Sequence, residues 1–188
     1  MKDVGFYILA GGKSSRMGRD KGFIKYNEKP LVQHVIDAIL PISDNINIVA
    51  NDSAYAFLKL KVHPDLIGDI GPVGGIYTVL KKSPYPYNFI LSCDMPLIRT
   101  NTIKYILNQH HNHLITIPVV KQQEQPLCAV YNSSILNNWH DWMKNGERRL
   151  LRMVKHFHPN LLDMKKYSRS TIKEFRSFNT KEDLKYLK

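Results

Sequence analysis

Apolar runs and helix-like stretches alternate along this 188-residue chain. The run Val4–Leu9 is apolar almost throughout, which is typical of a strand buried in a sheet. Apolar residues recur at helical spacing over 31–40, directly behind Pro30, a favourable residue for the start of a helix. The predicted strands are 4–9, 46–50, 88–92, 114–120, 127–131 and a segment near 173–178. The predicted helices are 31–40, 73–82, 100–110 with Thr100 as its cap, 134–144, 147–157 and a short last helix capped by Thr180.

The alternation of strands and helices predicts an α/β fold, a Rossmann-like three-layer sandwich with a mostly parallel central sheet. No repeat, low-complexity tract or linker interrupts the chain, so we expect a single domain over residues 1–188. Ligands of such folds bind beyond the carboxyl ends of the strands. We therefore expect the segments after Leu9, Ala50 and Ser92 to converge on one crevice.

The segment after the first strand, residues 9–21, has the composition of a phosphate-binding loop. It reads L-A-G-G-K-S-S-R-M-G-R-D-K and contains the adjacent glycines Gly11 and Gly12 together with two lysines and two arginines. Glycines let backbone N–H groups approach a ligand, and clustered cations neutralise a polyanion. A Walker A loop would need glycine in place of Tyr7, and the dinucleotide fingerprint G-x-G-x-x-G is absent. The loop therefore indicates a nucleotide-binding protein of another class.

Asp94 stands just past the predicted strand 88–92, at the mouth of the expected crevice. Magnesium in proteins prefers one or two carboxylates together with substrate phosphates and water, so Asp94 is a candidate ligand. A purely turn-forming aspartate is the alternative. Lys21, Lys13 and Arg16 are the candidates for neutralising bound phosphates.

Two further polar residues follow predicted strands and could bind a nucleoside. Asp65 offers a carboxylate, which matches the N1–H and N2–H₂ donors of guanine, and Asn51 could contact a base or ribose. Both residue types are also common in turns, so a structural role stays open for each.

The net charge of +11 is concentrated towards the end of the chain, where residues 141–188 hold 13 Lys or Arg and 6 Asp or Glu. Such a surface attracts phosphates of any kind. Zinc-finger and RNP motifs are absent, which favours a small phosphate over nucleic acid. Two cysteines, Cys93 and Cys128, make no disulfide framework, and no apolar run approaches the roughly 18 residues of a membrane span. We expect a cytoplasmic protein without membrane contact.

Motifs from both ends of the chain resemble nucleotidyltransferases of the MobA type. The first motif, at 9–21, is shared in part with sugar-nucleotide pyrophosphorylases. G-P-V-G-G at 71–75 is similar to the family's G-P-L-A-G, and C-D-M-P at 93–96 to its C-D-x-P. G-E-R-R at 146–149 and N-T-K-E-D-L at 179–184, with lysine where the family often has proline, favour the molybdenum cofactor guanylyltransferases within that superfamily.

The resemblance implies transfer of GMP from GTP to molybdenum-bound molybdopterin, with Mg²⁺ as cofactor. It implies that Leu9, Ala10 and Gly11 line the nucleotide site and that Lys21 contacts phosphate. It assigns nucleoside binding to Asn51 and Asp65 and the metal to Asp94. Together with the residue chemistry above, the predicted catalytic set is Lys21, Asp94 and Arg16, with Asp94 as metal ligand. The predicted binding set is Leu9, Ala10, Gly11, Gly12, Lys13, Lys21, Asn51, Asp65, Asn179, and Arg148 and Arg149 as a cradle for the pterin phosphate.

Other functions stay open at this point. A CTP-dependent enzyme acting on molybdopterin or on a small phosphorylated alcohol would keep the loop, Lys21 and Asp94 and change the base-reading residues. A non-catalytic nucleotide-binding carrier would be expected to have a degraded loop or to lack Asp94, and neither defect is visible. Molybdoenzymes or cofactor-delivery proteins are the partners that the resemblance implies.

Overall fold

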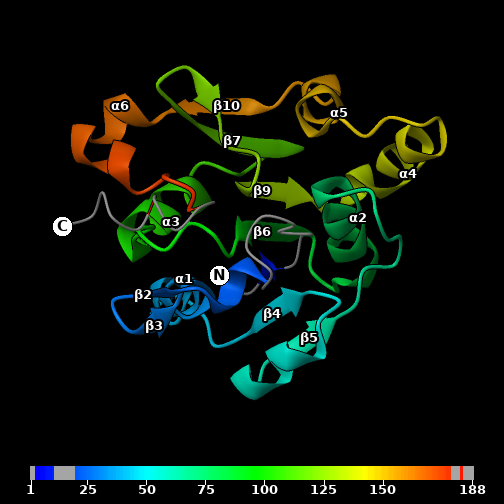
Figure 1. The fold of residues 1–188 in the computed structure, drawn as a ribbon. Coiled ribbons are helices and arrows are strands. Elements are labelled where there is room, and N and C mark those ends of the chain that lie inside the picture. The colour runs from blue at the N-terminus through cyan, green and yellow to red at the C-terminus, as the bar shows by residue number, and fades with distance from the viewer. Residues whose placement is uncertain (1–2, 11–19, 179–182, 184–188) are drawn as a thin grey trace.

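The computed structural model describes residues 3–10, 20–178 and 183, and its central feature is an eight-stranded sheet. The strands lie in the order β10-β7-β9-β6-β1-β4-β5, and β8 pairs with β7 (Figure 1). Their bounds are β1 Val4–Leu9, β4 Ile46–Val49, β5 Lys61–His63, β6 Tyr87–Ser92, β7 Ile115–Val120, β8 Gln123–Glu124, β9 Cys128–Asn132 and β10 Asn160–Asp163. A separate two-stranded hairpin joins β2, Lys25–Tyr26, to β3, Lys29–Pro30.

The strands that carry the candidate site are parallel and end in one row. β1 lies between β6 and β4, and β5 follows on the far side of β4, all in parallel pairs. The register pairs Leu9 with both Ser92 and Val49, and Val49 with His63. β9 runs antiparallel between β6 and β7. The predicted α/β fold with a mostly parallel sheet is confirmed, and its strands end together as expected.

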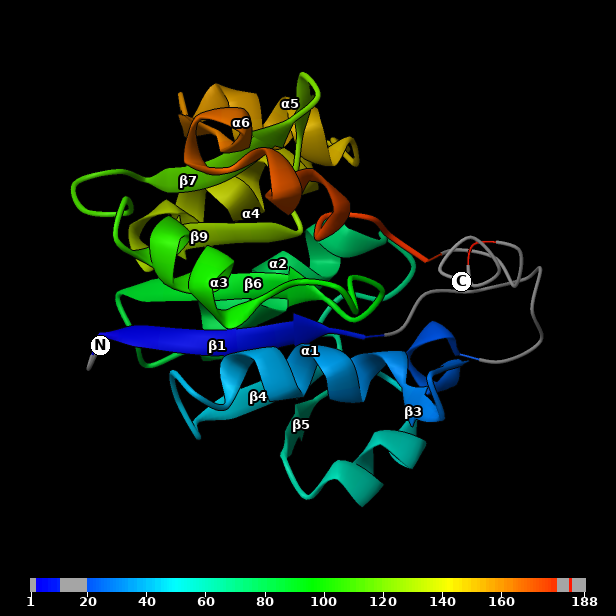
Figure 2. The ribbon, with the colours of Figure 1, turned by 90° about the vertical axis from the view of Figure 1, so that its left-hand side faces the viewer.

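Helices cover both faces of the sheet, which makes three layers (Figures 1 and 2). Phe6 and Ile8 of β1 face one core cluster, which is shared with α1, α3 and α6. Tyr7, between them, faces the other cluster, which is shared with α2, α4 and α5. Both faces are apolar because both are buried, and the period-two alternation of side chains decides which core each residue joins. The helices are α1 Leu31–Ile39, α2 Pro72–Lys82, α3 Thr100–Leu107, α4 Leu136–Lys144, α5 Leu150–His156 and α6 Met164–Tyr167. Within the described residues the 3₁₀ helices are η1 Lys21–Phe23, η2 Ser53–Leu58, η3 Ser133–Ile135 and η4 Arg169–Lys173.

No helix within the described ranges is long and apolar enough to cross a membrane.

The strand predicted near 173–178 is wrong. The chain leaves η4 there and continues as a turn, and the outer position beside β7 is taken by β10. Phe175 and Phe178 are both buried, three residues apart, and this spacing suits a turn against the core better than an alternating strand. The predicted last helix, with Thr180 as its cap, lies outside the described residues.

The prediction that Thr100 caps α3 is also wrong. Its hydroxyl donates a hydrogen bond to the carbonyl of Ala38 at 2.8 Å, away from the helix end. The start of α3 is held instead by Glu174, whose Oε2 accepts the Arg99 N–H at 3.2 Å and the Thr102 hydroxyl at 2.7 Å. A carboxylate near helix N–H groups satisfies donors that have no partner inside the helix. The C-terminal part of the chain therefore supports the segment that follows β6.

Candidate functional site

The candidate site lies where β1, β4, β5 and β6 end, on one side of the molecule (Figure 2). Backbone hydrogen bonds continue the sheet one residue past these strands. Ala10 N donates to Val49 O at 2.9 Å, and Ala50 N donates to His63 O at 3.0 Å. Cys93 N donates to Leu9 O at 3.0 Å. The loops that leave this edge therefore start from fixed points.

Lys21 and Asp94, 73 positions apart in the numbering, come together at this edge. Lys21 Nζ lies 3.9 Å from Asp94 Oδ2, and the two side chains are 30% and 14% exposed. The backbone carbonyl of Asp94 accepts a hydrogen bond from Phe178 N at 2.9 Å, which ties the loop to the C-terminal segment. The structure thus places the predicted metal ligand beside the predicted phosphate-binding lysine.

The Asp94 carboxylate has the chemistry that a magnesium ion needs. Its Oδ1 is buried and has no hydrogen-bond partner among the residues that the structure describes. Burying an unpartnered carboxylate oxygen is unfavourable unless a ligand completes its coordination. No group of three or more His, Cys, Asp or Glu side chains suited to a metal occurs in the described part of the chain. A metal held by Asp94 would therefore take most of its ligands from substrate phosphates and water.

Asn51 and Asp65 form a reciprocal pair at the same edge. The backbone N–H of Asp65 donates to Asn51 Oδ1 at 2.8 Å, and Asn51 Nδ2 donates to Asp65 Oδ2 at 3.3 Å. Asp65 Oδ1 is buried without a partner among the described residues. Burial raises the pKa of Asp65, and the hydrogen bond from Asn51 lowers it in part. The pair presents one oriented carboxylate oxygen that can accept N–H donors from a base.

Tyr55 of η2 is a member of this edge that the sequence reasoning missed. It is fully buried, and its hydroxyl donates to Asp20 Oδ1, which also accepts the Gly22 N–H at 2.9 Å. Burial raises the pKa of Tyr55, and the nearby Cys93 and Asp20 raise it further, so the hydroxyl stays protonated as a donor. No local pattern marks Tyr55 in the sequence. The fold explains Gly22 beside it, because a Cβ there would lie 2.1 Å from the Tyr55 hydroxyl oxygen and only glycine fits.

The glycine motif at 71–75 begins α2 beneath the end of β1. Gly71 is the cap residue with φ of +60°, and Pro72 occupies the first turn. A Cβ on Gly75 would lie 3.2 Å from Leu9 Cδ1, so glycine lets the helix pack closely on β1. Leu9 and Ala10 are thereby fixed at the base of the edge.

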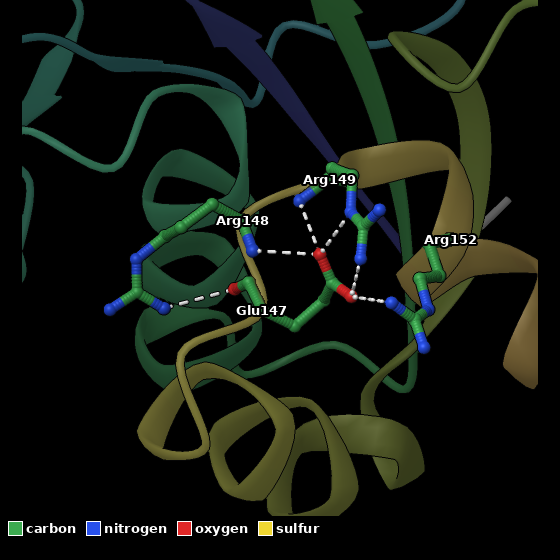
Figure 3. Close-up of polar contacts among 4 residues, drawn as sticks. All are labelled: Glu147, Arg148, Arg149 and Arg152. Atoms are coloured by element: carbon green, nitrogen blue, oxygen red, sulfur yellow. Dashed lines mark hydrogen bonds and ion pairs between the residues drawn. The ribbon is translucent and has the colours of Figure 1, made fainter.

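Arg148 and Arg149 lie between α4 and α5, where Glu147 organises them (Figure 3). Glu147 Oε1 accepts two hydrogen bonds from Arg149, one from the backbone N–H at 2.9 Å and one from the side-chain Nε–H at 3.0 Å. Glu147 Oε2 lies 3.2 Å from Arg152 Nη1, and Arg148 Nη1 donates to Met143 O at 2.7 Å. The hydrogen bonds from Arg149 hold the pKa of Glu147 down at about 2. The three arginines outnumber the one carboxylate, so this cluster is cationic.

The same cluster surrounds a pocket of about 560 Å³ on the α2 side of the sheet. The indole N–H of Trp139 in α4 donates to Val73 O at 3.2 Å, which anchors this side to the start of α2. The pocket is lined by Trp142, Asn145, Gly146, Glu147, Arg148, Arg149 and Arg152.

The remaining predicted site residues, Gly11, Gly12, Lys13, Arg16 and Asn179, lie outside the described residues.

Sequence comparison places this architecture among known proteins. The chain matches the family described as "MobA-like NTP transferase domain" over residues 6–160. It is 40% identical over 137 residues to the "Probable molybdenum cofactor guanylyltransferase" of Flavobacterium johnsoniae, covering 72% of each chain. It is 30% identical over 181 residues to the "Molybdenum cofactor guanylyltransferase" of Vibrio parahaemolyticus, covering 94% of this chain and 91% of the relative.

Solved structures share the same fold. A protein from Aquifex aeolicus is similar with a TM-score of 0.81 at 25% identity, covering 95% of this chain and 94% of that one. The molybdopterin-guanine dinucleotide biosynthesis protein A of Archaeoglobus fulgidus has a TM-score of 0.78 at 21% identity, with 97% and 95% covered. The second likeness shows the fold alone.

Proposed function

The chain belongs to the MobA-like NTP transferase family and is a nucleotidyltransferase, and from this premise we propose that it transfers GMP from GTP to molybdenum-bound molybdopterin. The names of the relatives support this choice of substrates. The observation that carries it is Asp94, whose buried, unpartnered Oδ1 lies at the strand edge while its Oδ2 lies 3.9 Å from Lys21 Nζ. A cation and a metal-binding carboxylate side by side suit a triphosphate.

The nucleotide is assigned to the ends of β1, β4 and β5. Leu9 and Ala10 precede the glycine-rich sequence, and its residues Gly11, Gly12, Lys13 and Arg16 are assigned to the phosphates from their chemistry alone. The Asp65 carboxylate, oriented by Asn51, accepts the N1–H and N2–H₂ groups of guanine. Cytosine does not present these two adjacent donors, so the Asn51–Asp65 pair favours GTP over CTP.

The reaction needs positioning and charge neutralisation rather than a covalent enzyme intermediate. An oxygen of the molybdopterin phosphate forms a bond to the α-phosphorus of GTP, and the bond from that phosphorus to the bridging oxygen breaks, releasing pyrophosphate. Lys21 neutralises charge that develops on the leaving pyrophosphate. Asp94 would hold Mg²⁺, which supplies charge neutralisation at the phosphate oxygens when bound.

The acceptor phosphate is assigned to the arginine pocket between α4 and α5. Arg148 and Arg149 line it together with Arg152, and Glu147 holds two of the three guanidinium groups in place. Guanidinium groups bind phosphates through paired N–H donors.

We further infer that the chain is a single domain, because one sheet runs from β5 to β10. We also infer a cytoplasmic location, because both cysteines are free and buried. Molybdoenzymes or cofactor-delivery proteins would receive the product.

The test is a pyrophosphate-release assay with GTP, CTP or ATP, each with and without molybdenum-loaded molybdopterin and Mg²⁺. We expect release only when GTP, the pterin and Mg²⁺ are all present. Release with CTP in place of GTP would overturn the guanylyl assignment and support the cytidylyl alternative. No release with any nucleotide would overturn the proposed reaction.

A further inference from the structure

We propose that Tyr55 is a positioning residue that holds Lys21 in place through Asp20. The inference rests on the proposed function, because Lys21 is taken as the group that contacts pyrophosphate. It adds a residue that no sequence motif marks, from a segment whose other end carries Asn51.

The hydrogen bonds around Asp20 set the backbone on both sides of Lys21. Asp20 Oδ1 accepts the Gly22 N–H at 2.9 Å and, in addition, the hydroxyl of Tyr55. The backbone of η1 then closes on itself, because Phe23 N donates to Asp20 O at 3.2 Å and Ile24 N to Lys21 O at 3.1 Å. Lys21 therefore sits on a short turn that Tyr55 of η2 ties to the core.

Packing makes this tie rigid. Tyr55 is fully buried in the core cluster that includes residues of α1, and the Phe23 ring stacks on it with centroids 4.5 Å apart. Gly22 leaves no room for a side chain, since a Cβ would lie 2.1 Å from the Tyr55 hydroxyl oxygen. Asp20, Gly22 and Phe23 thus surround one tyrosine, and the backbone of Lys21 is fixed although its side chain is 30% exposed.

The segment that carries Tyr55 also carries the nucleoside contact. η2 begins directly after Asp52, whose Oδ1 accepts the Ala54 N–H at 2.8 Å. Asn51, one residue earlier, makes the reciprocal pair with Asp65. One short stretch, residues 51–55, therefore carries both the partner of Asp65 and the tyrosine that holds Asp20.

The conservative variant Tyr55→Phe removes the hydroxyl and keeps the stacked ring. We expect kcat to fall by roughly tenfold while the KM for GTP stays within about twofold, because the hydrogen bond that the variant removes positions Lys21 against charge that develops in the transition state. The matched control is Tyr7→Phe, which removes the hydroxyl of another buried tyrosine, on the α2 side of the sheet. It should leave kcat and KM unchanged.

A double-mutant cycle on Mg²⁺-pyrophosphate affinity tests the route through Lys21. Calorimetric Kd values are measured for the full-length wild type, Tyr55→Phe, Lys21→Ala and the double variant. Tyr55→Phe should raise the Kd by about five- to tenfold with Lys21 present and by less than twofold in Lys21→Ala. An equal rise in both backgrounds, or no rise in either, overturns the proposal. Because this readout needs no turnover, a wild type that binds pyrophosphate but fails to use GTP would defeat the proposed reaction separately.

Discussion

The Asp94 carboxylate allows a substitution that separates chemistry from stability. Asp94→Asn keeps the size of the side chain and an oxygen acceptor, and it removes the charge. At 3.9 Å the gross attraction between Lys21 Nζ and Asp94 Oδ2 is about 4 kcal/mol at an effective dielectric constant of about 20. Lys21 is 30% exposed, so solvent screens the pair and its net contribution to folding is about 1 kcal/mol or less.

Loss of the metal ligand should act much more strongly on the reaction. Charge neutralisation by a metal ion at the phosphates contributes several kcal/mol to the transition state, and each 1.4 kcal/mol is about tenfold in rate. We expect Asp94→Asn to lower kcat by at least about 10³-fold and to raise the Mg²⁺ concentration needed for half-maximal rate. The thermal midpoint should stay within a few degrees of the wild type.

The assay is pyrophosphate release during a Mg²⁺ titration, together with thermal unfolding of the same samples. The control variant is Asp44→Asn, which removes an exposed carboxylate before β4 and leaves the site intact. Full activity in Asp94→Asn at wild-type Mg²⁺ dependence would refute the metal role. A large fall in the thermal midpoint would refute the stability reasoning.

Four further outcomes are expected. Lys21→Ala should lose transfer by about 10²-fold or more with the fold intact by circular dichroism, and normal GTP turnover would remove Lys21 from the site. GTP affinity should fall as the pH is lowered, because only the ionised form of Asp65 accepts both guanine donors. Burial raises the pKa of Asp65, so the fall should begin at a higher pH than it would for an ordinary aspartate. Asp65→Asn should abolish the effect, and a pH-independent Kd for the wild type would contradict the assignment. The pKa of Glu147 is about 2 in the folded protein, below the unfolded value of about 4.3. Ionised Glu147 therefore stabilises the fold above about pH 5, and this stabilisation is lost as the pH falls towards 2. In Glu147→Gln the thermal midpoint should depend less on pH between 5 and 3, and an unchanged dependence would count against the ion cluster. Arg148→Ala should weaken binding of molybdopterin by about tenfold in a direct binding titration, and an unchanged affinity would reject the arginine pocket as the acceptor site.

Most of the sheet could be predicted from local pattern, and its edges could not. β1 and β6 are buried on both faces, so their apolar runs are visible in the chain itself. β5 and β10 are three and four residues long and contain exposed positions, so they carry little pattern. These short strands form because they pair with β4 and β7, and the sequence pattern does not show which strands pair.

The candidate site divides in the same way. Lys21, Asp94, Asn51 and Asp65 could be selected because each follows a recognisable strand or motif, and parallel strands end at one edge. Their partners could not be selected, because hydrogen bonds between distant segments leave no periodic signal. The prediction of Thr100 as the cap of α3 failed for this reason: the acceptor is Glu174, which only the folded chain brings to that helix.

The sequence by itself determined the class of fold, the buried strands and the chemistry of the loops that follow them, because burial and residue type are local properties. Tertiary structure alone decided that Lys21 lies 3.9 Å from Asp94, that Asn51 orients Asp65, and that Tyr55 holds Asp20. These contacts depend on the distances and angles between packed elements, and packing couples residues that no local pattern relates.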